Sequence, residues 1–354
     1  MTSLDEVLKK AVQDSASDIF IIAGGYLSYE VAGKIRPMDN TMRLTSTETS
    51  YFIDEIYNYA KRSKEHFLKN GDDDFSFAVE GVARFRVNTY MQRGSQATVI
   101  RVVSFTIPDY RKLQIPDEVI ELSKLQHGMI IISGTAGSGK STTQACIIDA
   151  INENRESHIV TLEDPIEYLH KNKKSIISQR EIAIDTDNYL TGLRACLRQA
   201  PDVILLGEMR DAETIRTAMT AAETGHLVIA TLHTKGAVNT IDRIVDSFPA
   251  DQQDQIKIQL SLVLDCIVSQ QLLPCVNGGM VPAVEIMKTV PAIRNMIRDS
   301  KNYQIDNVIQ TSGNLGMVSM DQYIVNLFQK GLISEETALM NCMNPEQVKR
   351  KIGK

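Results

Sequence analysis

The sequence predicts a two-domain α/β protein: an α+β first domain, then a domain built on a mostly parallel sheet. A length of 354 residues exceeds the usual size of one domain. From Gly128 onward, short apolar runs alternate with segments of helical spacing, as expected of strands that helices cover on both faces. Pro108 and Pro116 interrupt a stretch without sustained periodicity, which is typical of a linker. We predict a first domain at 1–104, a linker at 105–116 and a second domain at 117–354.

The elements of the first domain follow from its hydrophobic spacing. Apolar residues recur at helical intervals in two segments and alternate like strands in the others. We expect helices at 4–14 and within 47–70, strands at 19–24 and 26–38 around a turn at Ala32 to Lys34, and antiparallel strands over 75–103 with turns at Gly81 and Gly94.

In the second domain, four apolar runs predict buried strands and a fifth segment predicts a helix. The strands are MIIIS (129–133), HIVTLE (158–163), VILLGE (203–208) and HLVIATLH (226–233), and the helix is TTQACIIDAINEN (142–154). From Asp251 the pattern is mostly helical, with a helical tail from about residue 285. Helices are expected at 255–272, 291–299, 320–330 and 334–342.

Composition excludes several classes of protein. The formal charge of −6 gives no broad attraction to nucleic acid, which makes a nucleic-acid partner unlikely. No apolar run approaches the ~18 residues of a membrane span, and the N-terminus lacks the pattern of an export signal. The five cysteines are scattered without any C-x-x-C, so the sequence indicates neither a zinc knuckle nor a disulfide framework. We expect a cytoplasmic protein.

The segment GTAGSGKS satisfies the phosphate-binding pattern G-x-x-x-x-G-K-[ST] between a predicted strand and a predicted helix. Its glycines let backbone N–H groups turn towards phosphates at the positive end of the helix dipole. Lys140 would reach the β and γ phosphates of ATP, the Ser141 hydroxyl would bind Mg²⁺, and Thr142 would donate to the α phosphate. The predicted nucleotide-binding residues are Gly134, Thr135, Ala136, Gly137, Ser138, Gly139, Lys140, Ser141 and Thr142.

Acidic side chains end two later strands. In an open parallel sheet the ligand crevice lies beyond the carboxyl ends of the strands, so Glu163 and Glu208 can reach the phosphates. We predict Glu163 as the general base and Glu208 as the acid that organises Mg²⁺, or the two roles exchanged. The alternative is that both are solvated acids at strand ends. Asp164 and Glu167 are weaker candidates, because either could cap the following segment.

Two histidines bracket the run HLVIATLH. His226 and His233 stand seven positions apart, roughly 23 Å along an extended strand and on opposite faces, so both cannot touch one phosphate. His233 lies at the carboxyl end, and we predict that it senses the γ phosphate or orients water. For His226 a structural role and a functional role are equally compatible with the sequence.

Together the segments GTAGSGKST, TLEDPIEYLH, VILLGEMRD and GHLVIATLHT resemble, in this order, the Walker A loop, Asp box, Walker B segment and His box of the secretion and pilus-assembly ATPase superfamily. The resemblance covers nearly the whole chain. It implies a PAS-like first domain, a RecA-like ATPase domain, and a homohexamer with ATP and Mg²⁺ at subunit interfaces. The loop departs from the common pattern at Ala136, and ASDIFI lacks a histidine often found in the first domain.

Two features resemble the branch of the superfamily that retracts type IV pili. The helix AIRNMIRD, Ala292 to Asp299, is similar to that branch's signature, and the tetracysteine zinc site and long N-terminal extension of other branches are absent. The resemblance implies that this helix serves retraction rather than hydrolysis. It also implies a location at the inner face of the cytoplasmic membrane and, as partner, the inner-membrane pilus platform protein.

The resemblance further implies arginine fingers from the first domain. Arg86 and Arg101 reproduce the fifteen-residue spacing of that pair in the family, and each would neutralise charge on the transferred phosphoryl group. The alternative is a pair of exposed strand arginines. Arg194, Arg198 and Arg210 are further cationic candidates.

The sequence thus predicts a hexameric ATPase motor for pilus retraction, in twitching motility, adhesion or DNA uptake. Two alternatives remain: an accessory or regulatory nucleotide-binding ring of the pilus machine, and a nucleic-acid translocase.

Overall fold

A computed structural model describes residues 3–31, 33–39, 42–103 and 107–353. The chain divides into two compact units, residues 1–106 with 167–169, and residues 107–166 with 170–354. Ala32 of the predicted turn and residues 105–106 of the predicted linker lie outside the described residues. Further along the predicted linker, Ile107, Tyr110 and Leu113 pack against a core cluster of the second unit.

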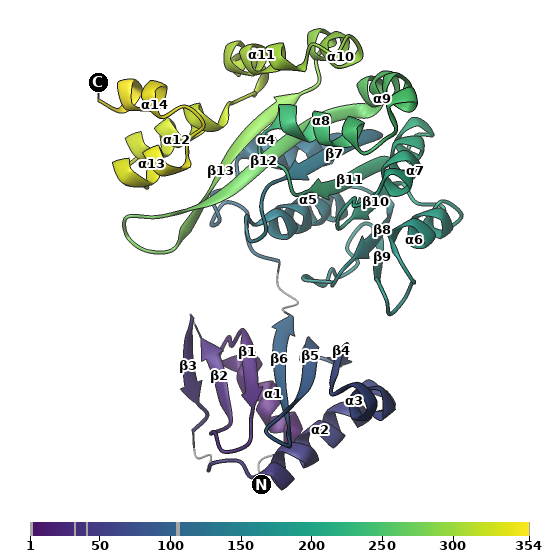
Figure 1. Cartoon of the computed structure of the whole chain (residues 1–354), viewed down its shortest axis with the longest axis vertical. Coiled ribbons are helices and arrows are strands. Elements are labelled where there is room, and N and C mark those ends of the chain that lie inside the picture. Colours follow the sequence, from purple (N-terminus) through teal and green to yellow (C-terminus); the bar gives the residue numbers. More distant parts are fainter. Residues whose placement is uncertain (1–2, 32, 40–41, 104–106, 354) are drawn as a thin grey trace. The chain divides into compact units, whose positions relative to one another are not determined.

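The first unit is a six-stranded antiparallel sheet with three helices (Figure 1). Its predicted strands and the hairpin turns at Gly81 and Gly94 are confirmed. Across the sheet the strands run β3 (Lys34–Pro37), β2 (Ser28–Val31), β1 (Asp18–Ile21), β6 (Ser95–Val103), β5 (Ala83–Gln92) and β4 (Asp72–Val79). The helices are α1 (Leu4–Gln13), α2 (Ser46–Ala60) and α3 (Glu65–Asn70).

Local signals set the ends of these helices. Ser3 begins α1 and Thr45 begins α2, each in a capping box whose glutamate returns a hydrogen bond. The helical pattern predicted within 47–70 divides because Lys61 takes a left-handed conformation, with φ of 50°, and ends α2. The helices bury Leu8, Phe52 and Phe67 in one core with the inner face of the sheet.

The second unit confirms the predicted α/β class with a seven-stranded sheet. Six strands run parallel to one another, and β13 runs antiparallel to β12 at one edge. The order is β13 (Met280–Lys288), β12 (Leu264–Pro274), β7 (Gly128–Ser133), β11 (Leu227–Leu232), β10 (Val203–Leu206), β8 (His158–Glu163) and β9 (Ile176–Glu181). The α-helices are α4 (Asp117–Ile120), α5 (Lys140–Asn154), α6 (Tyr189–Cys196), α7 (Ala212–Glu223), α8 (Ala237–Asp246), α9 (Ala250–Val263), α10 (Pro291–Arg298), α11 (Ile305–Thr311), α12 (Met320–Gln329), α13 (Glu335–Asn341) and α14 (Pro345–Ile352).

The helix predicted at 255–272 is wrong in its second half. Helix α9 ends at Val263, and Leu264 begins β12, which pairs with β7 on one side and β13 on the other. A strand between two neighbours is buried on both faces, so its apolar run lacks the alternation that distinguishes a strand from a helix. The polar edge strand β9 carries no such run and was not predicted.

The C-terminal helices α12, α13 and α14 lie together beside the hairpin of β12 and β13 (Figure 1). Leu273 and Val281 of the hairpin and Ile324 of α12 share their apolar core. The helical tail begins at Pro291, so the first residues of the tail predicted from about 285 belong to β13. No helix in the described part of the chain has both the length and the apolar character needed to cross a membrane.

Candidate active site

The predicted phosphate-binding loop, Gly134 to Ser141, connects the carboxyl end of β7 to the N-terminus of α5. Gly134 has φ of 149°, and a Cβ there would lie 2.2 Å from the Gln270 carbonyl oxygen. Gly139 caps α5 with φ of 85°, and a Cβ there would lie 2.8 Å from Gln270 Nε2. Only glycine fits either position, because a side chain would be strained and would collide with β12.

The lysine of the loop is held inside it. Lys140 is buried, and its Nζ donates to the carbonyl oxygens of Gly134 at 2.8 Å and Thr135 at 2.9 Å. Ser141 and Thr142 follow in the first turn of α5. Among the described residues, the buried Ser138 hydroxyl has no hydrogen-bond partner. A positive helix end, a loop lysine and an unsatisfied donor fit a phosphate-bearing ligand.

Gln270, which the sequence analysis missed, clamps this loop from β12. Its side chain is 3% exposed; Nε2 donates to the Ser138 carbonyl oxygen at 2.8 Å and Oε1 accepts from the Thr143 hydroxyl at 2.7 Å. One amide therefore holds both the loop and the first turns of α5. The signal in the sequence was a polar pair, Gln270 and Gln271, inside an apolar run that was assigned to a helix.

We expect Gln270→Leu to weaken ATP binding about tenfold and to lower the free energy of unfolding by about 2–4 kcal/mol, because a buried carbonyl and a buried hydroxyl each lose their partner. Titration with a fluorescent ATP analogue and urea unfolding measure the two effects. The matched control is Gln271→Leu, since the Gln271 side chain donates to the Asn341 carbonyl oxygen at 3.0 Å rather than to the loop. Equal nucleotide affinity in both variants would contradict the clamp.

The two predicted catalytic acids lie at the ends of adjacent strands. Leu162 of β8 pairs with Leu206 of β10, so Glu163 and Gly207 follow side by side. Glu163 Oε1 accepts from the Thr161 hydroxyl at 2.5 Å and from Gln179 Nε2 at 3.1 Å. The carboxylate is therefore already oriented by neighbouring strands.

Glu208 lies between two cationic or polar partners. Arg210 forms an ion pair with Oε1, and His233 Nε2 lies 3.3 Å from Oε2. Burial disfavours the charged form of Glu208, but Arg210 and His233 outweigh burial and hold its pKa below the ordinary value. Arg210 also lies 3.7 Å from Asp164. Glu208 is thus a carboxylate, as a metal-organising acid must be.

The predicted site residues of the second unit lie at the carboxyl ends of neighbouring strands of the sheet. The strands β7, β11, β10 and β8 are neighbours in that order, and their carboxyl ends carry the loop, His233, Glu208 and Glu163 in turn. Helix α5 spans part of this edge, because Gln144 Nε2 donates to the Leu206 carbonyl oxygen at 3.3 Å. The arrangement brings a phosphate-binding loop and two acids to the carboxyl ends of neighbouring strands, where open parallel sheets bind ligands.

His226 lies at the opposite end of β11 and binds the C-terminus of α7. Its Nδ1 lies 2.8 Å from the Ala221 carbonyl oxygen and 3.2 Å from the Thr224 hydroxyl. These contacts give it a structural role, because they satisfy groups at a helix end.

The two candidate arginine fingers are direct cross-strand partners in the first unit. Arg86 of β5 pairs in register with Arg101 of β6. Each is held by an acid of its own unit: Arg86 by Asp74 at 2.9 Å and Arg101 by Asp18 at 3.0 Å. The Arg86–Asp74 pair is half-exposed, so Arg86 can change partner at little cost, whereas the second pair joins an exposed Arg101 to a buried Asp18 carboxylate. Among the other cationic candidates, Arg194 pairs with Glu213 at 3.5 Å and Arg198 is exposed.

Helix α10, which contains the AIRNMIRD segment, buries an apolar stripe. Ile293 and Ile297 are fully buried and Met296 packs beside them. Arg294 donates to the Leu262 and Thr289 carbonyl oxygens, at 3.2 and 3.3 Å. Arg294 thus fixes α10 against the end of α9 and the end of β13.

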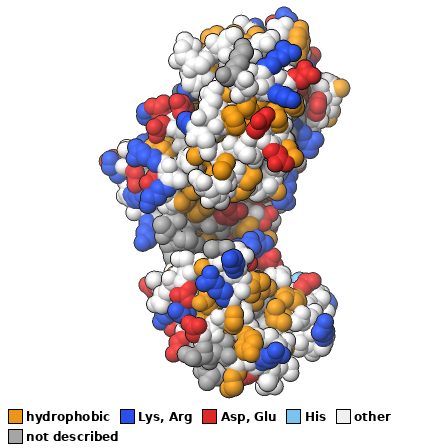
Figure 2. Space-filling view, turned by 90° about the vertical axis from the view of Figure 1, so that its left-hand side faces the viewer, with side chains coloured by type: hydrophobic (Ala, Val, Ile, Leu, Met, Phe, Trp, Pro, Cys, Tyr) orange, Lys and Arg blue, Asp and Glu red, His pale blue; other side chains and the backbone are white. Residues whose placement is uncertain are grey.

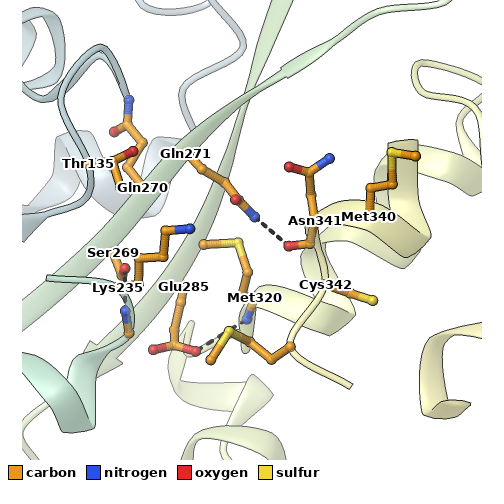
Figure 3. A pocket seen from close by; sticks show the side chains of 12 residues that line it. Thr135, Lys235, Ser269, Gln270, Gln271, Glu285, Met320, Met340, Asn341 and Cys342 are labelled. Carbon is orange, nitrogen blue, oxygen red and sulfur yellow. Dashed lines mark hydrogen bonds between the residues drawn. The ribbon is translucent and has the colours of Figure 1, made fainter. Parts of the chain in front are cut away.

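A buried carboxylate links the loop after His233 to the C-terminal helices. Glu285 of β13 accepts from Ala237 N, the first residue of α8, at 2.8 Å and from Met320 N, the first residue of α12, at 3.3 Å. It lines a 140 Å³ cavity together with Thr135, Lys235 and Gln270 (Figure 3). One side chain therefore caps two helices beside the phosphate-binding loop.

The free energy of unfolding should depend on pH because Glu285 titrates differently in the folded and the unfolded state. Burial raises its pKa above the ordinary 4.5, despite two backbone N–H donors. The folded state therefore keeps a proton that the unfolded state releases, and this contribution to stability declines as pH rises from about 4.5 through the raised pKa. We expect the unfolding free energy of the parent, relative to Glu285→Gln, to fall over that range in urea titrations. A difference independent of pH would contradict this.

Known proteins that resemble this chain include an ATPase, which agrees with a phosphate-binding site. Residues 1–327 match the family model described as Type II/IV secretion system protein. The type IV pilus retraction ATPase PilT of Pseudomonas aeruginosa is 42% identical over 344 residues, 97% of this chain and 99% of the relative. A twitching motility protein of Neisseria gonorrhoeae is 43% identical over 310 residues, 87% of this chain and 82% of the relative.

A crystal structure of the pilus retraction motor PilT with bound ADP resembles the fold, with a TM-score of 0.90, 44% identity and 99% of both chains covered. The family model spans residues 1–327, which is most of the chain. The chain belongs to the family of Type II/IV secretion system proteins.

Proposed function

We propose that this chain is an ATP-hydrolysing motor that drives the retraction of type IV pili, as a homohexamer with ATP at its subunit interfaces. The observation that carries the proposal is the meeting of Lys140, Glu163 and Glu208 at one sheet edge, in a chain similar over 97% of its length to a pilus retraction ATPase. The solved relative holds ADP, which supports a nucleotide as ligand.

Each residue of the site has a separate role in hydrolysis. The loop amides and Lys140 grip the phosphates at the N-terminus of α5. Glu163 takes a proton from the attacking water, and its carboxylate is held ready for that by Thr161 and Gln179. His233, in contact with Glu208, orients water or senses the terminal phosphate.

The residues present fit Mg²⁺ as the partner of ATP. The ion prefers oxygen ligands and is usually bound through one or two carboxylates plus phosphates. The Ser141 hydroxyl at the start of α5 and the ionised Glu208 would hold it. When bound, Mg²⁺ neutralises the charge that develops on the phosphate oxygens.

The arginines supply the link between hydrolysis and motion. In a ring, Arg86 and Arg101 of one subunit would leave Asp74 and Asp18 and bind phosphate in the neighbouring subunit. Nucleotide binding would then close the interface and product release would reopen it. The ring would work in the cytoplasm, at the inner face of the membrane, against the inner-membrane platform protein of the pilus.

Counting surface pili tests the biological role. We expect deletion of the gene to leave an excess of pili that do not retract, and expression of the intact chain to restore retraction. Expression of Glu163→Gln should not restore it. Loss of pili on deletion would instead indicate a motor for assembly, and normal retraction would indicate an accessory ring.

The formal charge of −6 does not favour a nucleic-acid translocase. On the face drawn in Figure 2, basic and acidic side chains are interspersed, whereas a translocase needs a positive track for phosphates. ATP turnover stimulated by DNA and sensitive to salt would favour that alternative.

A further inference from the structure

We propose that Thr161 and Gln179 are positioning residues that hold the Glu163 carboxylate by its Oε1 atom, so that β8 and β9 rather than the nucleotide determine how it faces the site. The inference rests on the proposed role of Glu163 as the base. It concerns the edge strand β9, which none of the nucleotide-binding motifs includes.

Strand geometry brings the three side chains together. Thr161 and Glu163 are two residues apart on β8, so they point to the same face of the sheet. Gln179 is the register partner of Thr161 on the parallel strand β9. The Thr161 hydroxyl and Gln179 Nε2 both donate to Glu163 Oε1, at 2.5 and 3.1 Å.

The orientation of the Gln179 amide follows from its second partner. The His170 backbone N–H donates to Gln179 Oε1 at 2.8 Å. Because a backbone N–H can only donate, the amide oxygen must face it, and the NH₂ group must face Glu163. The reversed amide would place an N–H against an N–H and a carbonyl against a carboxylate. Gln179 therefore ties Glu163 to the segment that precedes β9.

This grip has a chemical consequence for a base. Proton transfer needs the accepting oxygen within hydrogen-bond reach of the water, so a carboxylate that can rotate loses rate. A merely structural contact between strands would not have this effect.

Two variants of near-identical shape test the proposal in the full-length, assembled protein. Thr161→Val and Gln179→Met each remove one donor; the first is buried, and the second lies on an edge strand and is partly exposed. We expect each to lower kcat for ATP about tenfold with KM unchanged within about twofold. Thr161→Ser, which keeps the hydroxyl, should recover most of the rate.

The control variant is Ser178→Ala, which alters the adjacent β9 position, where the hydroxyl contacts His158 Nε2 instead. It should leave kcat unchanged. The proposal is overturned if Gln179→Met keeps kcat within about twofold of the parent, or if its loss appears in KM alone. Failure of the proposed function is distinguishable, because the parent protein would then show no ATP turnover; turnover retained by Glu163→Gln would contradict only the role of Glu163 as the base.

Discussion

Glu163→Gln is expected to lower ATP turnover at least about a hundredfold while nucleotide still binds, because a general base contributes roughly 10²–10⁴ to the rate. Glutamine keeps the size of the side chain and an oxygen that can accept from Thr161, but it cannot take a proton from water. The binding groups, the loop amides and Lys140, are unchanged. Phosphate release by the assembled protein measures turnover, and titration with a fluorescent ADP analogue measures binding.

The matched control for this change is Glu153→Gln, at an exposed position near the C-terminal end of α5 that pairs with Lys173 at 2.8 Å. We expect turnover within twofold of the parent, since exposed pairs contribute little. If Glu163→Gln kept full turnover, Glu163 would not be the base. A hundredfold loss in Glu208→Gln with intact Mg²⁺-dependent binding would then assign the base to Glu208 and exchange the two roles.

Arg86→Ala is expected to reduce turnover about a thousandfold or more, because an arginine finger typically contributes 10³–10⁵. The guanidinium would stabilise charge that develops only in the transition state, so kcat should fall far more than affinity. The control is Arg84→Ala, two residues earlier on the same face of β5, where the guanidinium contacts the Ser76 hydroxyl at 2.6 Å. Steady-state kinetics of both variants measure the difference.

Mixed rings separate a finger that acts on a neighbour from one that acts within its own subunit. Neither Arg86→Ala nor Lys140→Ala subunits should turn over ATP alone. In a randomly mixed hexamer, about a quarter of the interfaces combine an intact arginine with an intact phosphate-binding loop. Co-assembled rings should therefore regain a measurable part of the activity. Absence of recovery in rings shown to be mixed would rule out action between subunits.

The phosphate-binding loop could be predicted from consecutive residues of the sequence. Its glycines, Lys140 and Ser141 act through backbone dihedrals and a helix end that a few consecutive residues create, so an apolar strand followed by a glycine-rich turn and a helical pattern was sufficient evidence. The same holds for the strand ends that carry Glu163, Glu208 and His233. Parallel strands expose their carboxyl ends at one edge whatever their order in the sheet.

The partners of these residues were not predictable in this way. Gln270 reaches the loop across 132 positions of sequence, and Gln179 reaches Glu163 through the pairing of β8 with β9. The pairing of Arg86 with Arg101 likewise depends on the register of β5 and β6. The spacing of residues along the chain does not indicate which strands become neighbours in the sheet.

The sequence by itself determined the class of fold, the phosphate-binding loop and the acids at the strand ends, because these depend on local periodicity and on side-chain chemistry. Only the tertiary structure decided that residues 264–274 form a strand, that Gln270 clamps the loop and that Glu163 is held by two donors. The physical reason is that burial on both faces removes the alternation by which a strand is identified. A hydrogen bond between distant residues exists only once the order and register of the strands are set.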